Sequence, residues 1–465
     1  MPATNPSSAS SSQLPFIVIT SLQKTDPETR ALIRKHVMLG KNRGKTRSLN
    51  LGESTISQDV NNEPTQQQVA LIQTCSTIPR KVGSDLSFIP FSETVEPPMI
   101  AGVLEFSSVA KKVVFSLESC VAFDRTSPFV FMQALTFDAA YLHAMIFATQ
   151  AYSAWMAGPV NSMASRSASL HYMKTVRLLQ ERLLLDDEAT KLSDSTLNVV
   201  LALAWYAHVT GDFESSRHHM AGLRTMIDLR GGIDTLKDIP KLLFEIVRCD
   251  IAMALHSGER PFFSFNNISH EPFLPYINQA RSYREENFLE NIDKRVSRVW
   301  AIMEQFCSLI NRSFDANHKI PQVILLDTIA SVMYNLLDLR FGSSSIDEAI
   351  RLGLLAFSSS VFLQWQSVKQ SYRHLATAYR SCLFEISFSR QVPSYLSLWL
   401  LIICGISTFD APNDNLRPLL RAKIELSEVS SWGEMRDIMG SFLWIGLVLD
   451  KAGEKYFEFV LSSED

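Results

Sequence analysis

The pattern of apolar and polar positions in this chain is helical over most of its length. Apolar side chains recur every three or four residues, the period of one face of an α-helix, and strand-like alternation is nearly absent after residue 30. Prolines in the stretch 87–108 are expected to prevent a long helix there. The spacing predicts helices over residues 107–122, 138–157, 163–184, 193–210, 212–230, 240–257, 288–311, 322–340, 346–365, 371–387, 394–407, 416–427 and 431–461 with a break. The expected fold class is therefore all-α, a multi-helix bundle or array.

The stretch 195–236 carries the clearest local pattern, two helices joined by a short turn. Gly211 and Asp212 separate the two apolar runs, and an aspartate there can accept hydrogen bonds from the backbone N–H groups that open the second helix. The glycine pair at 231–232 follows the last helical turn, where the chain needs residues that tolerate positive φ. The ring of Trp205 is expected to pack inside this hairpin, against the second helix.

The N-terminal part of the chain lacks the helical pattern and divides by composition. Residues 1–13 are small and polar and are expected to be disordered. Residues 14–42 are expected to form a short extended segment followed by a basic helix. Residues 43–84, rich in Gly, Ser, Asn, Gln and Thr, predict a flexible linker. The helical domain is then expected over residues 85–465.

Composition describes a globular protein with a large core. Hydrophobic residues make up 46% of the 465 positions and charged residues 20%. The net charge of −4 argues against a protein that grips nucleic acid over its whole surface. The six cysteines are far apart and form no C-x-x-C pair, which disfavours a disulfide framework and a structural zinc site. No secretory signal is visible at residues 1–13.

The most hydrophobic run, residues 395–406, is shorter than the roughly 20 residues that a membrane-spanning helix needs. We expect it to be a helix buried inside the protein, and no membrane association is predicted. An amphiphilic anchor is the weaker interpretation of the same run.

Positive charges are concentrated between residues 30 and 47, where no acidic residue opposes them. Such a segment can bind an acidic groove, and one interpretation is a nuclear-import signal. The alternatives are a solvated basic helix end beside a linker and, less favoured, direct contact with DNA. The candidate import residues are Arg34, Lys35, Lys41, Arg43, Lys45 and Arg47.

No arrangement typical of catalysis, cofactor binding or metal binding emerges. Adjacent helical side chains such as His218 and His219 point about 100° apart, which suits a shared metal poorly. The acids in 183–190 lack the third aspartate of a D-D-x-x-D motif, because position 190 is threonine. Nucleophile-elbow, phosphate-loop and dinucleotide motifs are also missing. We therefore predict a protein that is not an enzyme and has no catalytic, cofactor or metal residues.

Several segments resemble the helical fungal-specific transcription-factor domain, which accompanies the binuclear zinc cluster in many fungal regulators. The hairpin ends in Arg-Gly-Gly followed by an apolar residue. Later come a G-x-R-P turn at 257–265, an E-A-x-R-L helix at 346–365 and a closing segment with F-L-W-I at 431–457. Each segment is weak alone, but their order matches that of the family over much of the chain.

The resemblance implies a nuclear regulator of transcription that acts through protein partners, other transcription regulators among them, or through a small-molecule effector. One departure limits it: this sequence has no six close-set cysteines of the kind that bind two zinc ions. Specific DNA binding by the chain itself is therefore not expected. The alternatives are a helical scaffold or a metabolite-binding protein without a transcriptional role, located in the cytoplasm.

Overall fold

The computed structural model describes residues 91–114, 117–123, 128–156, 162–264, 274, 288–364, 372–387, 392–408 and 416–462. The chain divides into two units, residues 1–80 and 81–465, and every described residue belongs to the second. The disordered start, the extended segment with its basic helix and the linker that the sequence predicts up to residue 84 all lie outside the described residues.

The all-α fold class predicted from the sequence is confirmed, with sixteen α-helices in the described part of the chain. These helices are α3 (Pro97–Val114), α4 (Pro128–Phe137), α5 (Ala139–Met156), α6 (Ser162–Leu184), α7 (Glu188–Lys191), α8 (Asp194–Thr210), α9 (Phe213–Leu229), α10 (Pro240–Ser257), α12 (Lys294–Asp315), α13 (Gln322–Asp338), α14 (Ile346–Phe362), α15 (Arg373–Ile386), α16 (Ser394–Thr408), α17 (Arg417–Leu426), α18 (Trp432–Gly440) and α19 (Gly446–Leu461). Two 3₁₀ turns accompany them, η2 (Ile233–Leu236) and η3 (Phe288–Glu290).

Most predicted helix bounds agree with the structure within a few residues, and the main error lies at the start. The prediction that prolines prevent a long helix near residue 98 is wrong, because α3 begins at Pro97. Prolines at the first positions of a helix lose no hydrogen bond, since the N–H groups there have no intrahelical partner. The short, almost wholly apolar α4 was not predicted, because it has no polar face to give it a period.

The predicted hairpin is formed by α8 and α9. Ser193 and Asp212 cap the two helices, accepting hydrogen bonds from the backbone N–H groups of Thr196 and Ser215. At the end of α9, Gly231 and Gly232 adopt φ of 114° and 96°, as the sequence predicts for this position. The Gly232 N–H then donates to the Ile227 carbonyl at 2.8 Å, which closes the helix.

Trp205 was expected to pack inside the hairpin against α9. Its side chain is partly buried, and its ring lies 5.9 Å from the Arg248 guanidinium on α10. The two helices of the hairpin are joined by Ser216, whose hydroxyl on α9 donates to the Ala204 carbonyl on α8 at 2.9 Å.

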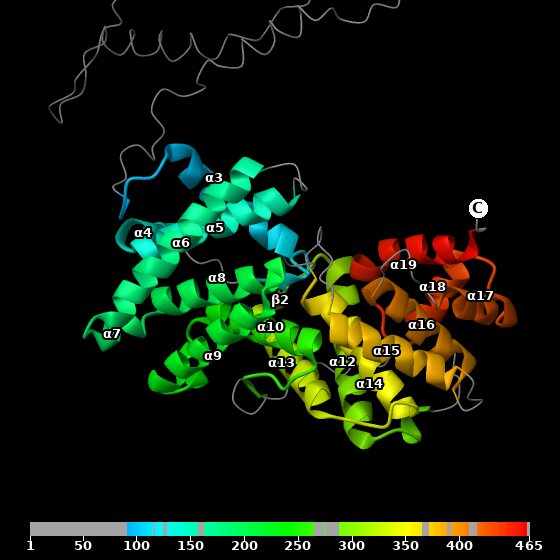
Figure 1. Ribbon diagram of the computed structural model, residues 1–465. Coiled ribbons are helices and arrows are strands. Elements are labelled where there is room, and N and C mark those ends of the chain that lie inside the picture. The colour runs from blue at the N-terminus through cyan, green and yellow to red at the C-terminus, as the bar shows by residue number, and fades with distance from the viewer. Residues whose placement is uncertain are drawn as a thin grey trace, which may run out of the picture. The chain divides into compact units, whose positions relative to one another are not determined.

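The helices pack in a chain of neighbours around a large core, and a second, small hydrophobic cluster lies between α3, α4 and α5. Helix α5 packs against α3, α6 and α8; α8 packs against α10; and α10 packs against α13 and α15. Helix α14 packs against α13, α15 and α16, and α16 also packs against α17 and α19. Figure 1 shows α3–α6 at one end of this helical unit and α16–α19 at the other.

Two short strands tie distant parts of this unit together. Strand β1 (Val121–Ala122) pairs in parallel with β2 (Ile320–Pro321), and Val121 faces Ile320 in the register. Strands of two residues carry no alternating pattern, so the sequence could not predict them. The pairing fixes the segment after α3 beside the start of α13.

The most hydrophobic run of the sequence lies in α16 and is buried, as expected. Leu398, Trp399 and Leu400 are fully buried in the core. Among the described residues, no helix is long and apolar enough to cross a membrane.

Candidate functional site

The segment that resembles the G-x-R-P turn is held by a buried carboxylate. Asp250 on α10 is 1% exposed. It accepts hydrogen bonds from the backbone N–H groups of Phe262 at 2.7 Å and Phe263 at 3.0 Å, and from the Tyr334 hydroxyl at 3.0 Å. Burial raises the pKa of Asp250 to about 6, although these hydrogen bonds oppose the shift. The network joins α10, the turn after it and α13.

A buried arginine two residues before Asp250 on α10 also joins neighbouring helices. The guanidinium of Arg248 is fully buried and donates to the carbonyl oxygens of Phe362 at 3.1 Å and Leu363 at 3.3 Å. It also pairs with Glu245 at 3.1 Å. The carbonyl groups at a helix C-terminus lack intrahelical partners, so Arg248 satisfies the end of α14 and attaches it to α10.

The E-A-x-R-L segment contains a second buried ion pair. Arg351 donates to Glu348 at 2.7 Å and 2.6 Å, in the two-pronged geometry that suits a guanidinium and a carboxylate. It also donates to the Leu336 carbonyl near the end of α13 at 3.0 Å. The side chains of Arg351 and Glu348 are 6% and 11% exposed. This pair therefore fixes α14 against α13.

The closing segment anchors the last helices through two tryptophans. The Trp399 indole N–H on α16 donates to the Leu443 carbonyl at 2.9 Å, and the Trp444 indole N–H donates to Asp450 at 2.7 Å. Asn311 on α12 donates to the Trp444 carbonyl at 2.8 Å. The break that the sequence predicts in 431–461 falls at these residues, between α18 and α19.

A polar pocket lies between α8, α9 and α10, and we call it the His208 pocket. Its lining is His208, Phe213, Arg217, Met253, His256 and Ser257, and its cavity volume is about 30 Å³. The rings of Phe213 and His256 are stacked with centroids 3.6 Å apart, and His208 meets both edge-on. A cavity of this size has room for about one water molecule and is far smaller than a typical ligand pocket.

His208 has an unusual environment within this pocket. Its side chain is 6% exposed, and its Nδ1 atom is buried without a hydrogen-bond partner. Burial, followed by the nearby His256, lowers the pKa of His208 to about 4, so the imidazole is neutral near pH 7. A neutral imidazole offers one donor and one acceptor.

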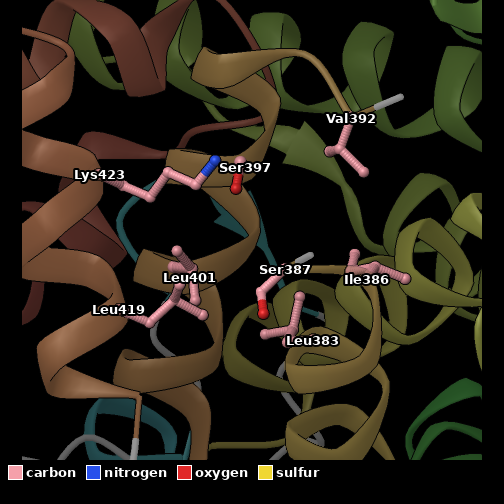
Figure 2. A pocket seen from close by; sticks show the side chains of 8 residues that line it. All are labelled: Leu383, Ile386, Ser387, Val392, Ser397, Leu401, Leu419 and Lys423. Atoms are coloured by element: carbon pink, nitrogen blue, oxygen red, sulfur yellow. The ribbon is translucent and has the colours of Figure 1, made fainter. Parts of the chain in front are cut away.

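A second, shallow concavity lies between α15, α16 and α17 (Figure 2), with a cavity volume of about 10 Å³. Its wall is largely apolar, with Leu383, Leu401 and Leu419 pointing into it. Lys423 extends from α17 toward Ser397, and no carboxylate in the described part of the chain pairs with it. Residues 388–391, at the edge between Ser387 and Val392, lie outside the described residues.

A network of polar side chains connects Glu93, which lies just before α3, to helices α5 and α6. Glu93 pairs with Lys174 and accepts a hydrogen bond from His143 Nε2 at 3.3 Å, and His143 Nδ1 lies 2.7 Å from His171 Nδ1. Because a carboxylate only accepts, His143 donates through Nε2, and His171 then donates to its Nδ1.

The residues that the sequence singles out are distributed as follows. Arg34, Lys35, Lys41, Arg43, Lys45 and Arg47 lie outside the described residues. His218 is exposed and His219 partly buried on α9, and the described residues contain no group of three or more potential metal ligands. Asp187 caps α7 by accepting from the Thr190 N–H at 3.3 Å. The five described cysteines, all buried, are free.

The buried polar residues were missed in the sequence. Arg248 and Asp250 interrupt an apolar run at 242–255, and charges inside such a run were the available signal. Nothing in the spacing connects His208 with His256, since they meet only when α8 and α10 pack together.

Comparisons with known proteins identify no relative of this chain. No family model matches, no curated protein matches, and no solved structure matches.

Proposed function

We propose that this chain regulates transcription through contacts with protein partners, other regulators among them, and through a small-molecule effector. In this proposal it works in the nucleus and leaves sequence-specific DNA binding to its partners. The resemblance to the fungal transcription-factor domain is the origin of the proposal.

One structural observation supports it. The four resembling segments coincide with joints of the described helical unit: the end of α9, the turn held by Asp250, the α13–α14 contact made by Arg351, and the α18–α19 junction. Residues at joints determine how helices are arranged, whereas exposed positions tolerate change. The resemblance therefore concerns the packing of the helices, and it offers no residues that perform chemistry.

The effector part of the proposal rests on the resemblance, since the His208 pocket, with a volume of about 30 Å³, is smaller than a typical ligand pocket. The second candidate is a metabolite-binding protein without a transcriptional role.

The test is a tethering experiment in a fungal host. The full chain is fused to an unrelated DNA-binding domain, and the expression of a reporter with the matching site is measured. We expect the fusion to raise or lower expression at least several-fold relative to the DNA-binding domain alone. A second reporter without the site serves as the control. An unchanged reporter with a stably produced fusion contradicts the transcriptional role and favours the metabolite-binding alternative.

A further inference from the structure

Helix α6 carries apolar side chains on its outer face as well as on its inner face. It packs against α5 and α8, and Thr175 and Leu179 are buried on the inner side. Leu170, Met173 and Leu184 are 59%, 58% and 86% exposed. With 100° between successive residues of a helix, these three side chains lie within about 60° of one another, on the side opposite Thr175. No described segment of the chain covers them.

These residues belong to one line of exposed positions, which we call the α6 stripe. Its members recur every three or four residues along the helix, so they face the same way. Single exposed apolar residues are common on protein surfaces, whereas an aligned group with a polar rim is typical of a contact surface. The α6 stripe consists of Leu170, Met173, Arg177, Gln180, Glu181 and Leu184.

The exposed charges along α6 change sign from one end to the other. Arg166 lies near the start of the helix, whereas Glu181 lies near its end and Asp186 just beyond it, and all three are exposed. The basic residue of the last turn, Arg182, is directed to Asp138 at 2.5 Å and leaves the acidic end unopposed on the surface. An antiparallel copy of α6 would therefore bring its acidic end to the basic end of this one.

The positions of the leucines have the symmetry that such a pairing needs. Arg177 lies seven residues after Leu170 and seven residues before Leu184. A twofold axis beside Arg177 therefore sets Leu170 of one protomer against Leu184 of the other, and the symmetry repeats this contact. The two Arg177 side chains lie near the axis together with both copies of Glu181, which already pairs with Arg177 within α6 at 3.3 Å. The four charges there balance.

We propose that the α6 stripe is a dimerisation surface and that it binds α6 of a second copy of this chain, antiparallel about a twofold axis at Arg177. Helix α6 has 23 residues and is therefore about 34 Å long. An interface of one helix from each protomer belongs to the small class, below about 1,200 Å², so the dimer is weak, with a dissociation constant of about 1–100 μM. The inference does not rest on the proposed function, because a scaffold or a metabolite-binding protein can dimerise in the same way.

Analytical ultracentrifugation of the purified full chain over a range of concentrations tests the proposal. We expect a reversible equilibrium between monomer and dimer. Leu184→Glu should weaken dimerisation about tenfold or more, because symmetry removes two apolar contacts at once. Leu426→Glu is the matched control, since Leu426 is 80% exposed and ends α17 as Leu184 ends α6. A wild type that stays monomeric overturns the proposal and leaves the stripe to a different partner, and equal dissociation constants for the wild type and Leu184→Glu overturn it as well.

Charge variants test the position of the axis. Arg177→Glu places four carboxylates around it and should weaken the dimer several-fold, since like charges that face each other oppose association. The double variant Arg177→Glu with Glu181→Arg exchanges the two charges, keeps the pair within α6 and should restore the wild-type dissociation constant. Both side chains are mostly exposed, at 68% and 61%, so folding is not at risk. A double variant as weak as Arg177→Glu would contradict an axis at this residue.

Cross-linking with a short bismaleimide tests the antiparallel direction. The variants carry Cys75→Ser, because the other five cysteines of the sequence are buried. Arg177→Cys, beside the axis, should cross-link to itself. Leu170→Cys and Leu184→Cys should form a cross-linked dimer when mixed but not separately, since in an antiparallel pair each lies about 21 Å along the axis from its own copy. Cross-linking of Leu184→Cys to itself, as a parallel pair requires, would overturn the proposed arrangement.

Discussion

Tyr334 on α13 donates its hydroxyl hydrogen to the Asp250 carboxylate on α10 at 3.0 Å, inside the core. The same carboxylate accepts two backbone N–H groups from the turn after α10. Burial raises the pKa of Tyr334 well above its usual value, so the phenol remains a donor at any ordinary pH. A single acidic side chain thus satisfies three buried donors from two other segments.

Substitutions that remove one or all of these hydrogen bonds should lower the stability of the protein by different amounts. Tyr334→Phe removes one donor and its partner bond together, and we expect a loss of about 1–2 kcal/mol in unfolding free energy. Asp250→Ala leaves three buried donors without an acceptor, and we expect a loss of at least about 3 kcal/mol. Denaturant unfolding followed by circular dichroism measures both. Losses below 1 kcal/mol for Asp250→Ala would contradict the network.

A second prediction concerns the close approach of α16 and α19. A Cβ added to Gly405 would lie 1.9 Å from the Tyr456 ring, closer than any real contact. Gly405→Ala should therefore force the two helices apart and cost about 2–3 kcal/mol. Gly222→Ala on the exposed face of α9 is the matched control, since nothing lies within 4 Å of its added Cβ.

The control should move in the opposite direction. Alanine loses less backbone freedom than glycine in a helix, so Gly222→Ala should stabilise the chain by about 0.5–1 kcal/mol. Thermal unfolding of both variants measures these changes in stability. Equal melting temperatures for Gly405→Ala and the wild type would show that α16 and α19 can separate without cost.

The contrast between these positions also shows what the sequence could predict. Gly211, Asp212 and the glycines at 231–232 define their helix ends by local chemistry, so the hairpin was predicted closely. Gly405 looks like any glycine in an apolar run, because its role depends on Tyr456 on another helix. The helices were therefore predictable from spacing, whereas their contacts were not.

In the candidate site, too, the helices could be predicted from the sequence but the contacts between them could not. His208 could be placed on the apolar face of a helix, but its pocket needs His256 and Met253 from α10. Trp205 was expected inside the hairpin because both helices have apolar faces at matching spacing, but the bond from Ser216 to Ala204 that joins them could not be predicted. The period of apolar residues indicates which face of a helix is buried. It does not identify the side chains of other helices that pack against that face.

A third prediction is a pH dependence that originates at His208. Its pKa is about 4 in the folded chain and about 6.5 when unfolded. Between these values the unfolded chain binds a proton that the folded chain does not, so this group destabilises the fold as pH falls from 6.5 to 4. Asp250, with a pKa raised to about 6, acts in the opposite direction over about pH 6 to 4.

The wild-type profile therefore combines two opposing slopes, and a variant is needed to separate them. His208→Phe cannot be protonated. Its unfolding free energy relative to the wild type should rise by about 3 kcal/mol between pH 7 and pH 4. The difference should be constant between pH 7 and pH 8, which is the internal control. A difference that stays constant down to pH 4 would show that His208 is readily protonated in the fold.

The last prediction concerns the basic segment, which lies outside the described residues. If it directs nuclear import, a fluorescent fusion of the full chain should accumulate in the nucleus. Changing Arg34, Lys35, Lys41, Arg43, Lys45 and Arg47 together to alanine should abolish that accumulation. Stability should change little, since substitutions of solvated side chains are usually worth less than about 0.5 kcal/mol each.

Removing six positive charges also changes the net charge, so the control must do the same. A second variant replaces six exposed basic side chains of the helical unit by alanine: Arg166, Arg177, Lys241, Lys294, Lys451 and Lys455. It should enter the nucleus as the wild type does, because an import receptor reads a cluster and not the total charge. If both variants remain nuclear, the segment is a solvated linker and import depends on a partner. If the wild type itself stays in the cytoplasm, the scaffold and metabolite-binding alternatives gain over the transcriptional one.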